Sequence, residues 1–236
     1  MGVIFDMDGV LIDSGAAHWE SWRIVAEEDG VDFTEEAFWA TFGMVSDVIV
    51  ARYWGANPPT DPAEIAAIVE RKERAFRESV ATHTTPIAGA VDFIRYLAGR
   101  GVKIAVGSSA PRENVEYILR WLGVRELFGD RVVAGDEVKN GKPAPEIFLT
   151  AAKKLGVAIE KCVAIDDAKN GVDAGRASGA ATIGFFSAGH SLDEYENADV
   201  VVRSFDEARS LLEIAEDGSS VRLRKSSAAK EGTTSL

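Results

Sequence analysis

The sequence predicts an α/β fold: a doubly wound, Rossmann-like parallel sheet with a small all-helical domain inserted after its first strand. The main evidence is a set of short apolar, β-branched runs, which are typical of strands buried on both faces of a sheet. These runs are Val3–Phe5, Val102–Val106, Arg131–Ala134, Cys162–Ile165, Thr182–Phe185 and Val200–Val202. From about Ile87 to about Ala215 they alternate with helical patterns, which is the order expected of a doubly wound sheet.

Two helices of this region have clear start and stop residues. Pro111 can open a helix whose apolar residues recur at helical spacing, and Gly123 ends it. The segment from Pro145 to Leu155 repeats the form and stops at Gly156. Both helices therefore support the alternating order.

The alternation is interrupted between about Ser14 and about Thr82, where only helical patterns are found. Asp61 and Glu64 have the spacing of a capping box, and Pro62 stands at the first helical position. The first strand is therefore followed by an all-helical insert before the alternation resumes.

These patterns divide the chain into three parts. We predict an α/β core of residues 1–13 and 83–216 and a helical domain of residues 14–82. Residues 217–236 are rich in Ser, Lys, Gly and Thr without apolar periodicity, so we expect a disordered tail there.

The composition excludes several classes of partner. The 236 residues contain 26 Lys and Arg against 38 Asp and Glu, a net charge of −12, which disfavours binding to nucleic acid or to an anionic membrane surface. The single cysteine, Cys162, cannot form an internal disulfide, which suits a reducing compartment. The first residues lack a basic leader and contain Asp6, Asp8 and Asp13. We therefore expect a soluble, cytoplasmic monomer.

Polar side chains follow several of the predicted strands, at the point where each strand ends. In parallel sheets these ends meet at one edge, where ligands bind. The side chains are those of Asp6, Asp8, Ser108, Ser109, Asp166 and Asp167, with Lys142 in a loop just ahead of a helix. Each one alone is an ordinary turn, cap or surface residue, whereas their convergence on one edge favours a functional site.

Four carboxylates at one edge repel each other unless a cation lies among them. Their oxygen atoms suit Mg²⁺, whereas the scattered His18, His83 and His190 and the lone Cys162 provide no zinc site. Neither GxGxxG nor GxxxxGK[ST] occurs in the chain, so nucleotide-binding fingerprints are lacking. A magnesium ion, a lysine and a hydroxyl around one carboxylate predict a site for a phosphoryl group.

The motifs resemble those of a known enzyme family. Asp6-Met7-Asp8-Gly9-Val10-Leu11, Ser108, Lys142 in GKPAPEIF, and Asp166-Asp167 with Gly171 are similar to the four ordered motifs of the haloacid dehalogenase superfamily. The likeness extends from Val3 to about Ala215 and is strongest to the branch of β-phosphoglucomutase and sugar-phosphate phosphatases. It implies a Mg²⁺-dependent phosphate-transfer enzyme that works through a phospho-aspartate, with the helical domain as a mobile cap.

The resemblance also implies a role for each core residue. Asp6 would be the nucleophile, and Asp8 would protonate the leaving alcohol while its backbone carbonyl contacts the metal. Ser108 would hold a phosphoryl oxygen, and Lys142 would balance the charge on Asp6 and the phosphate. Asp167 would bind Mg²⁺ directly, and Asp166 would bind it directly or through water, so the expected metal set is Asp6, Asp8, Asp166 and Asp167.

The sequence departs from the family pattern after these aspartates. The motif usually continues with Ser, and this chain has Ala168, which removes a hydroxyl near Asp167. The assignment of Asp167 does not change, because Ala168 would not have been a ligand.

Further residues are candidates for contacts with the substrate. By resemblance, His18 would contact the leaving oxygen and steer Asp8, although a histidine on a solvated helix face is an equal reading. Ser109, Arg112 and Asn170 could line the pocket or be ordinary helix-start residues.

Three functions remain open at this stage. The first is a phosphatase of a small phosphomonoester, such as a sugar or polyol phosphate. The second is a β-phosphoglucomutase, which the absence of an arginine at Ser46 disfavours, because a mutase must hold two phosphates. The third is a non-catalytic phospho-aspartate switch of the response-regulator kind, although such receivers lack both the helical insert and a second Asp like Asp8.

Overall fold

The computed structural model describes residues 1–42, 44–187, 191–215 and 221–224. Its internal contacts divide the chain into an α/β unit, made of Met1–Ile12 and the described residues from Pro86 onward, and a helical unit, Asp13–Thr85. The sequence placed these boundaries after residues 13 and 82, and the structure places them after Ile12 and Thr85. The two short strands β2 (Ile12–Asp13) and β3 (Thr85–Pro86) lie where the chain passes from one unit to the other.

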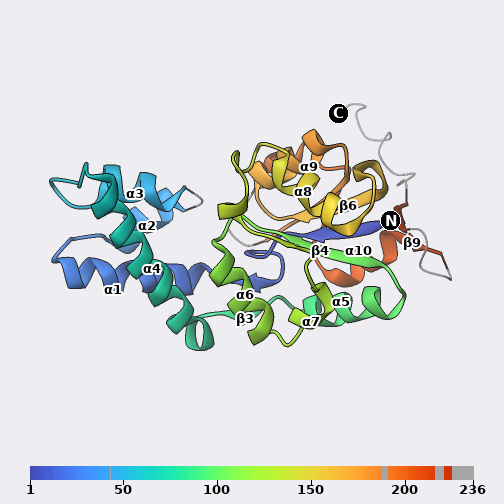
Figure 1. Cartoon of the computed structure of the whole chain (residues 1–236), viewed down its shortest axis with the longest axis horizontal. Helices are drawn as coiled ribbons and strands as arrows, with labels where there is room; N and C mark the ends of the chain where they lie inside the picture. Colours follow the sequence, from blue (N-terminus) through green and yellow to red (C-terminus); the bar gives the residue numbers. More distant parts are fainter. Residues whose placement is uncertain (43, 188–190, 216–220, 225–236) are drawn as a thin grey trace, which may run out of the picture. The chain divides into compact units, whose positions relative to one another are not determined.

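The α/β unit contains a six-stranded parallel sheet with the strand order β5-β4-β1-β6-β7-β8 (Figure 1). Its strands are β1 (Gly2–Phe5), β4 (Lys103–Gly107), β5 (Val132–Val133), β6 (Cys162–Asp166), β7 (Ala181–Phe185) and β8 (Val200–Val202). Each predicted run forms one of these strands, so the predicted fold class is confirmed. The first strand lies in the interior of the sheet, between β4 and β6.

Helices cover both faces of the sheet. They are α5 (Ala90–Gly99), α6 (Arg112–Trp121), α7 (Arg125–Phe128), α8 (Glu146–Leu155), α9 (Lys169–Ser178) and α10 (Phe205–Leu211), joined by the short 3₁₀ turns η1 (Gly135–Glu137), η2 (Ile159–Lys161) and η3 (Leu192–Tyr195). Figure 1 shows α8 and α9 on one face and α5 on the other. Both faces are therefore dry, which is why the strands are apolar throughout rather than alternating.

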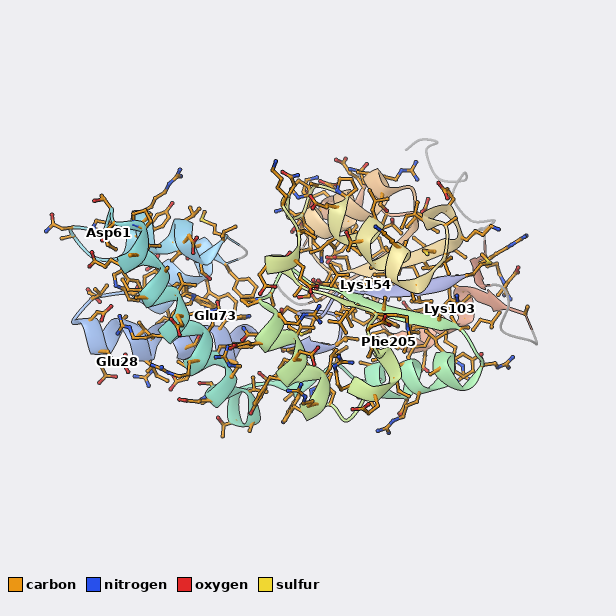
Figure 2. The ribbon with its side chains drawn as sticks, in the orientation of Figure 1. Glu28, Asp61, Glu73, Lys103, Lys154 and Phe205 are labelled. Carbon is orange, nitrogen blue, oxygen red and sulfur yellow. The ribbon has the colours of Figure 1, made fainter. Side chains whose placement is uncertain are left out.

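Successive residues of β1 serve the two faces in turn, because side chains alternate along a strand. Ile4 packs with Phe148 of α8 in one core cluster. Phe5 points to the opposite face, where its ring meets Phe93 edge-on at 6.0 Å and Phe93 in turn lies 5.2 Å from Phe205 at the start of α10 (Figure 2). One buried strand thus joins both layers of helices to the sheet.

Proline and glycine bound the helices as the sequence predicts. Pro111 and Pro145 directly precede α6 and α8, and Gly156 ends α8 in the left-handed conformation at φ 63°. A left-handed residue is the ordinary way to close a helix, and glycine adopts it without steric cost.

The helical unit has its own apolar core. Its helices are α1 (Gly15–Asp29), α2 (Glu35–Thr41), α3 (Ser46–Tyr53) and α4 (Pro62–His83). Trp22, Phe38 and Ile68 are among the buried residues that pack together there. At the surface, Arg71 of α4 pairs with Asp29 at 2.7 Å, which ties α4 to the end of α1. Asp61 caps α4 by accepting a hydrogen bond from the Ala63 N–H.

The prediction of a disordered tail is wrong for one segment. Val221–Leu223 forms a strand, β10, which pairs antiparallel with β9 (Leu212–Ile214). Pairing of this kind depends on backbone hydrogen bonds, so a short strand needs no long apolar period to form. Residues 217–220 and 225–236 of the predicted tail lie outside the described residues.

Among the described residues, no helix has the length and apolar character that crossing a membrane would require.

The aromatic cluster under β1 gives a test of the fold. We expect Phe93→Ala to lower the free energy of unfolding by about 3–5 kcal/mol, because Phe93 is buried between two rings and its loss leaves a cavity. Leu149→Ala, on the exposed face of α8, is the control and should change the free energy by about 0.5 kcal/mol or less. Urea unfolding followed by circular dichroism measures both, and equal effects would contradict this account of the core.

Candidate active site

The site forms at the carboxyl ends of three neighbouring strands. Asp6 directly follows β1, Ser108 directly follows β4, and Asp166 is the last residue of β6. Because β1 lies between β4 and β6, these three ends are adjacent. The Asp6 N–H donates to the Ile165 carbonyl at 2.9 Å, which fixes the start of the loop after β1 against β6.

A buried lysine links two of the carboxylates. Lys142 Nζ lies 2.5 Å from Asp6 Oδ1 and 2.7 Å from Asp166 Oδ2, and all three side chains are almost fully buried. Burial alone would lower the pKa of Lys142, but the charges of Asp166 and Asp6 and their hydrogen bonds raise it above its usual value. Lys142 therefore stays protonated throughout the range in which proteins work.

The charge of one lysine does not balance the carboxylates around it. Burial raises the pKa of Asp6 well above its usual value; Lys142 lowers it, and the nearby Asp166, Asp167 and Asp8 raise it further. A second positive charge in the site would relieve this repulsion and keep Asp6 ionised.

The carboxylates can share such a charge. Asp6, Asp166 and Asp167 each offer one ligand oxygen, and these atoms lie within 4.8 Å of one another. Carboxylate oxygens suit Mg²⁺, which usually takes one or two carboxylates together with water and a phosphate oxygen. By donor type and spacing, the residues fit a hard divalent cation.

Two glycines leave the space that these carboxylates occupy. A Cβ on Gly171, in α9, would lie 1.9 Å from the Asp166 carboxyl carbon. A Cβ on Gly9 would lie 1.7 Å from Asp167 Oδ2, and Gly9 also has φ +72°, which disfavours any side chain. Both glycines belong to the motifs recognised in the sequence, and the close approach gives a physical reason for them.

Two hydroxyl groups contact Asp167, and sequence reasoning missed both. Ser187 Oγ donates to Asp167 Oδ2 at 2.9 Å, and the Tyr195 hydroxyl donates to the Asp167 backbone carbonyl at 2.5 Å. Burial raises the pKa of Tyr195 to about 12, and the Asp167 charge adds to this, so the phenol keeps its proton. Neither residue belongs to a recognisable motif, and each becomes a neighbour of Asp167 only through the path of the chain after β7.

Ser108 is buried at the end of β4. Its Oγ accepts a hydrogen bond from the Ala110 N–H at 3.1 Å, as a capping residue would. A hydroxyl can donate at the same time, so this contact does not prevent Ser108 from binding a phosphoryl oxygen.

The remaining candidates of the α/β unit lie apart from this cluster. Ser109 and Asn170 are exposed. Arg112 forms ion pairs with Glu116 and Glu137 and donates to the Val132 carbonyl at 3.0 Å, a carbonyl that Lys154 also contacts at 2.6 Å. The structure thus places Arg112 in a network at the edge strand β5.

His18 belongs to the helical unit and is half-buried there. Its ring stacks on Phe76 with centroids 4.2 Å apart, and its Nδ1 lies 3.0 Å from Lys72 Nζ. The ammonium of Lys72 also contacts Glu73 of α4, labelled in Figure 2, at 3.0 Å. A lysine ammonium only donates, so Nδ1 accepts and the ring proton lies on Nε2. His18 is therefore packed and hydrogen-bonded rather than a free residue on a solvated helix face, while His190 lies outside the described residues.

The raised pKa of Asp6 predicts a stability effect in the metal-free protein. Above the ordinary aspartate pKa, the native protein holds a proton that the unfolded chain has lost, so Asp6 destabilises the fold increasingly as pH rises towards its native pKa. We expect metal-free Asp6→Asn to melt at a higher temperature than the wild type at pH 7, with a smaller difference near pH 4. Thermal melts in EDTA test this, with the exposed Asp130→Asn as control, and a lower melting temperature at pH 7 would contradict it.

The space at Gly171 predicts an effect on cation binding. Gly171→Ala should displace the Asp166 carboxylate and lower the affinity for Mg²⁺ by about tenfold or more, as measured by isothermal titration calorimetry. Gly99→Ala, in α5 with no atom within 4 Å of the added Cβ, is the matched control and should bind like the wild type. Unchanged affinity in Gly171→Ala would show that Asp166 takes no part in the cation site.

The chain is similar in sequence to three characterised enzymes. It is 34% identical to the phosphorylated carbohydrates phosphatase of Thermotoga maritima over 81% of this chain and 87% of that protein. It is 35% identical to the fructose-1-phosphate phosphatase YqaB of Escherichia coli over 75% of this chain and 92% of that protein. A β-phosphoglucomutase of Bacillus subtilis is 30% identical over 85% of this chain and 88% of that protein.

A solved structure has the same fold, and a family model covers most of the chain. The crystal structure of CbbY from Rhodobacter sphaeroides in complex with phosphate is 28% identical, with a TM-score of 0.76 over 87% of this chain and 95% of that one. Residues 1–179 match the family model described as haloacid dehalogenase-like hydrolase. The expected family and the prediction of an enzyme are therefore confirmed: the chain belongs to the haloacid dehalogenase-like hydrolases.

Proposed function

We propose that the protein is a Mg²⁺-dependent phosphatase that hydrolyses a small phosphomonoester, a sugar or polyol phosphate, through a phospho-aspartate on Asp6. The observation that carries the proposal is the buried contact of Lys142 with both Asp6 and Asp166, beside Asp167. Such a site holds one carboxylate in place and leaves the others to bind a cation, which is the arrangement that phosphoryl transfer to a carboxylate needs.

Asp6 is the nucleophile in this proposal. A carboxylate must be ionised to attack phosphorus, and the burial of Asp6 opposes ionisation. Lys142 counters that effect and fixes the direction of the carboxylate through its 2.5 Å contact. Bound Mg²⁺ would add positive charge for Asp6 and the phosphoryl oxygens, held by Asp6, Asp166, Asp167 and the Asp8 backbone carbonyl.

Asp8 and Ser108 complete the set. Asp8 would protonate the leaving alcohol and later take a proton from the water that hydrolyses the phospho-aspartate. Its charge is close enough to raise the pKa of Asp6, and the two carboxyl groups therefore share one site. Ser108, buried beside them at the end of β4, would donate a hydrogen bond to a phosphoryl oxygen.

The substrate class rests on the relatives and on one residue of the helical unit. Two of the similar enzymes are named for phosphorylated carbohydrates and for fructose 1-phosphate. Ser46, where the mutase branch is expected to have an arginine, donates its hydroxyl to Glu73 at 3.4 Å. A neutral side chain so engaged is a poor partner for a second phosphate, which favours hydrolysis over mutase chemistry. With its acidic charge and single cysteine, we infer a cytoplasmic monomer acting on a small molecule.

Asp6→Asn tests the mechanism. The amide cannot attack phosphorus, so we expect Mg²⁺-dependent hydrolysis of p-nitrophenyl phosphate to fall by about 10³-fold or more. EDTA should abolish the wild-type activity, and added Mg²⁺ should restore it. Asp130→Asn, an exposed carboxylate of the same unit, is the control. Near-normal turnover by Asp6→Asn would refute the proposal.

A phosphate-release screen separates the three functions. Sugar, polyol, nucleotide and carboxylate phosphates are incubated with enzyme and Mg²⁺, and free phosphate is measured; release from sugar or polyol phosphates is expected. Conversion of β-glucose 1-phosphate to glucose 6-phosphate with little free phosphate would instead identify a mutase. A long-lived phosphoprotein that releases no phosphate would identify a switch.

A further inference from the structure

The segment after β7 holds Asp167 at two points. Ser187 Oγ donates to the carboxylate oxygen Oδ2 at 2.9 Å, and the Tyr195 hydroxyl donates to the backbone carbonyl at 2.5 Å. Ala168, the next residue along the chain, has no side-chain donor. We propose that Ser187 and Tyr195 are positioning residues that fix Asp167 for binding the cation; this inference rests on the proposed function, in which Asp167 binds Mg²⁺.

Tyr195 is held firmly enough to position another residue. It is 2% exposed, and its hydroxyl also donates to the Phe185 carbonyl at 3.3 Å. A Cβ on Gly184 would lie 2.4 Å from the tyrosine ring, so the ring packs directly on the backbone of β7. Gly184 is paired in register with Asp166 of β6, which places this ring beside the strand end where the carboxylates lie.

Ser187 is anchored through its neighbour. The Phe186 N–H donates to the Val202 carbonyl of β8 at 2.7 Å, and the Phe186 ring lies 5.9 Å from that of Tyr195, with Arg203 stacked 4.5 Å from its centroid. These contacts continue the pairing of β7 with β8 by one residue. The Ser187 hydroxyl thus leaves the end of an ordered strand rather than an unattached loop.

The carboxylate of Asp167 is confined from two sides. Gly9 lies so close to Oδ2 that an added Cβ would be 1.7 Å away, and Ser187 binds the same oxygen. A ligand whose orientation is already fixed loses little conformational freedom when the cation binds, and partners of this kind typically change metal affinity by about 10–100-fold.

The test is the Mg²⁺ affinity of Ser187 variants, measured by isothermal titration calorimetry without substrate. Ser187→Ala should weaken binding by about tenfold, and Ser187→Thr, which keeps the hydroxyl, should restore most of the affinity. Ser210→Ala, whose hydroxyl only contacts the Glu207 carbonyl in α10, is the matched control. Tyr195→Phe should also weaken binding, and the Ser187 pair keeps the test decisive if Tyr195→Phe fails to fold.

Two readouts separate this role from a merely structural one. The melting temperature of Ser187→Ala in EDTA should match the wild type, whereas the rise in melting temperature that Mg²⁺ produces should be smaller. Wild-type affinity in Ser187→Ala, or a threonine variant no better than the alanine variant, would overturn the inference. If Asp6→Asn is inactive and Ser187→Ala binds Mg²⁺ normally, the proposed function stands and the inference fails. If the wild type binds no Mg²⁺, the proposed function itself fails.

Discussion

The buried ammonium of Lys142 is the contact on which the rest of the site depends. Asp6 and Asp166 come from strand ends far apart in the sequence, and Lys142 bonds to both of them. Without a positive charge, their burial beside Asp167 and Asp8 would force protons onto them or push them apart. The lysine makes the cluster possible but does not neutralise it, and that residual negative charge is what suits the site to a divalent cation and a phosphate.

The architecture could be predicted because its causes are local. Strands such as β1 and β6 are apolar runs, since both of their faces are covered, and α6 and α8 begin after prolines. The order of these elements then implies which strand ends meet. Local pattern failed at β10, where pairing with β9 rather than periodicity forms the strand.

The site was only partly accessible from the sequence. Aspartates after strands and a family-like lysine identify the region, because those residues stand in motifs. The bond between Lys142 and Asp6 joins residues 136 positions apart, and no spacing rule gives its geometry. Ser187 and Tyr195 lie in no motif at all and reach Asp167 through the fold. The same holds for Arg112, whose partners Glu116 and Glu137 were not apparent before the structure.

The network around Arg112 has a consequence at the rim of the sheet. Strand β5 is an outer strand, and a bare outer strand offers its backbone to any passing extended chain. Here the Val132 carbonyl already receives Arg112 and Lys154, two long cationic side chains that cover this position (Figure 2). A foreign strand seeking to extend the sheet on this side would have to displace both, so this rim resists the edge-to-edge stacking that leads to aggregation.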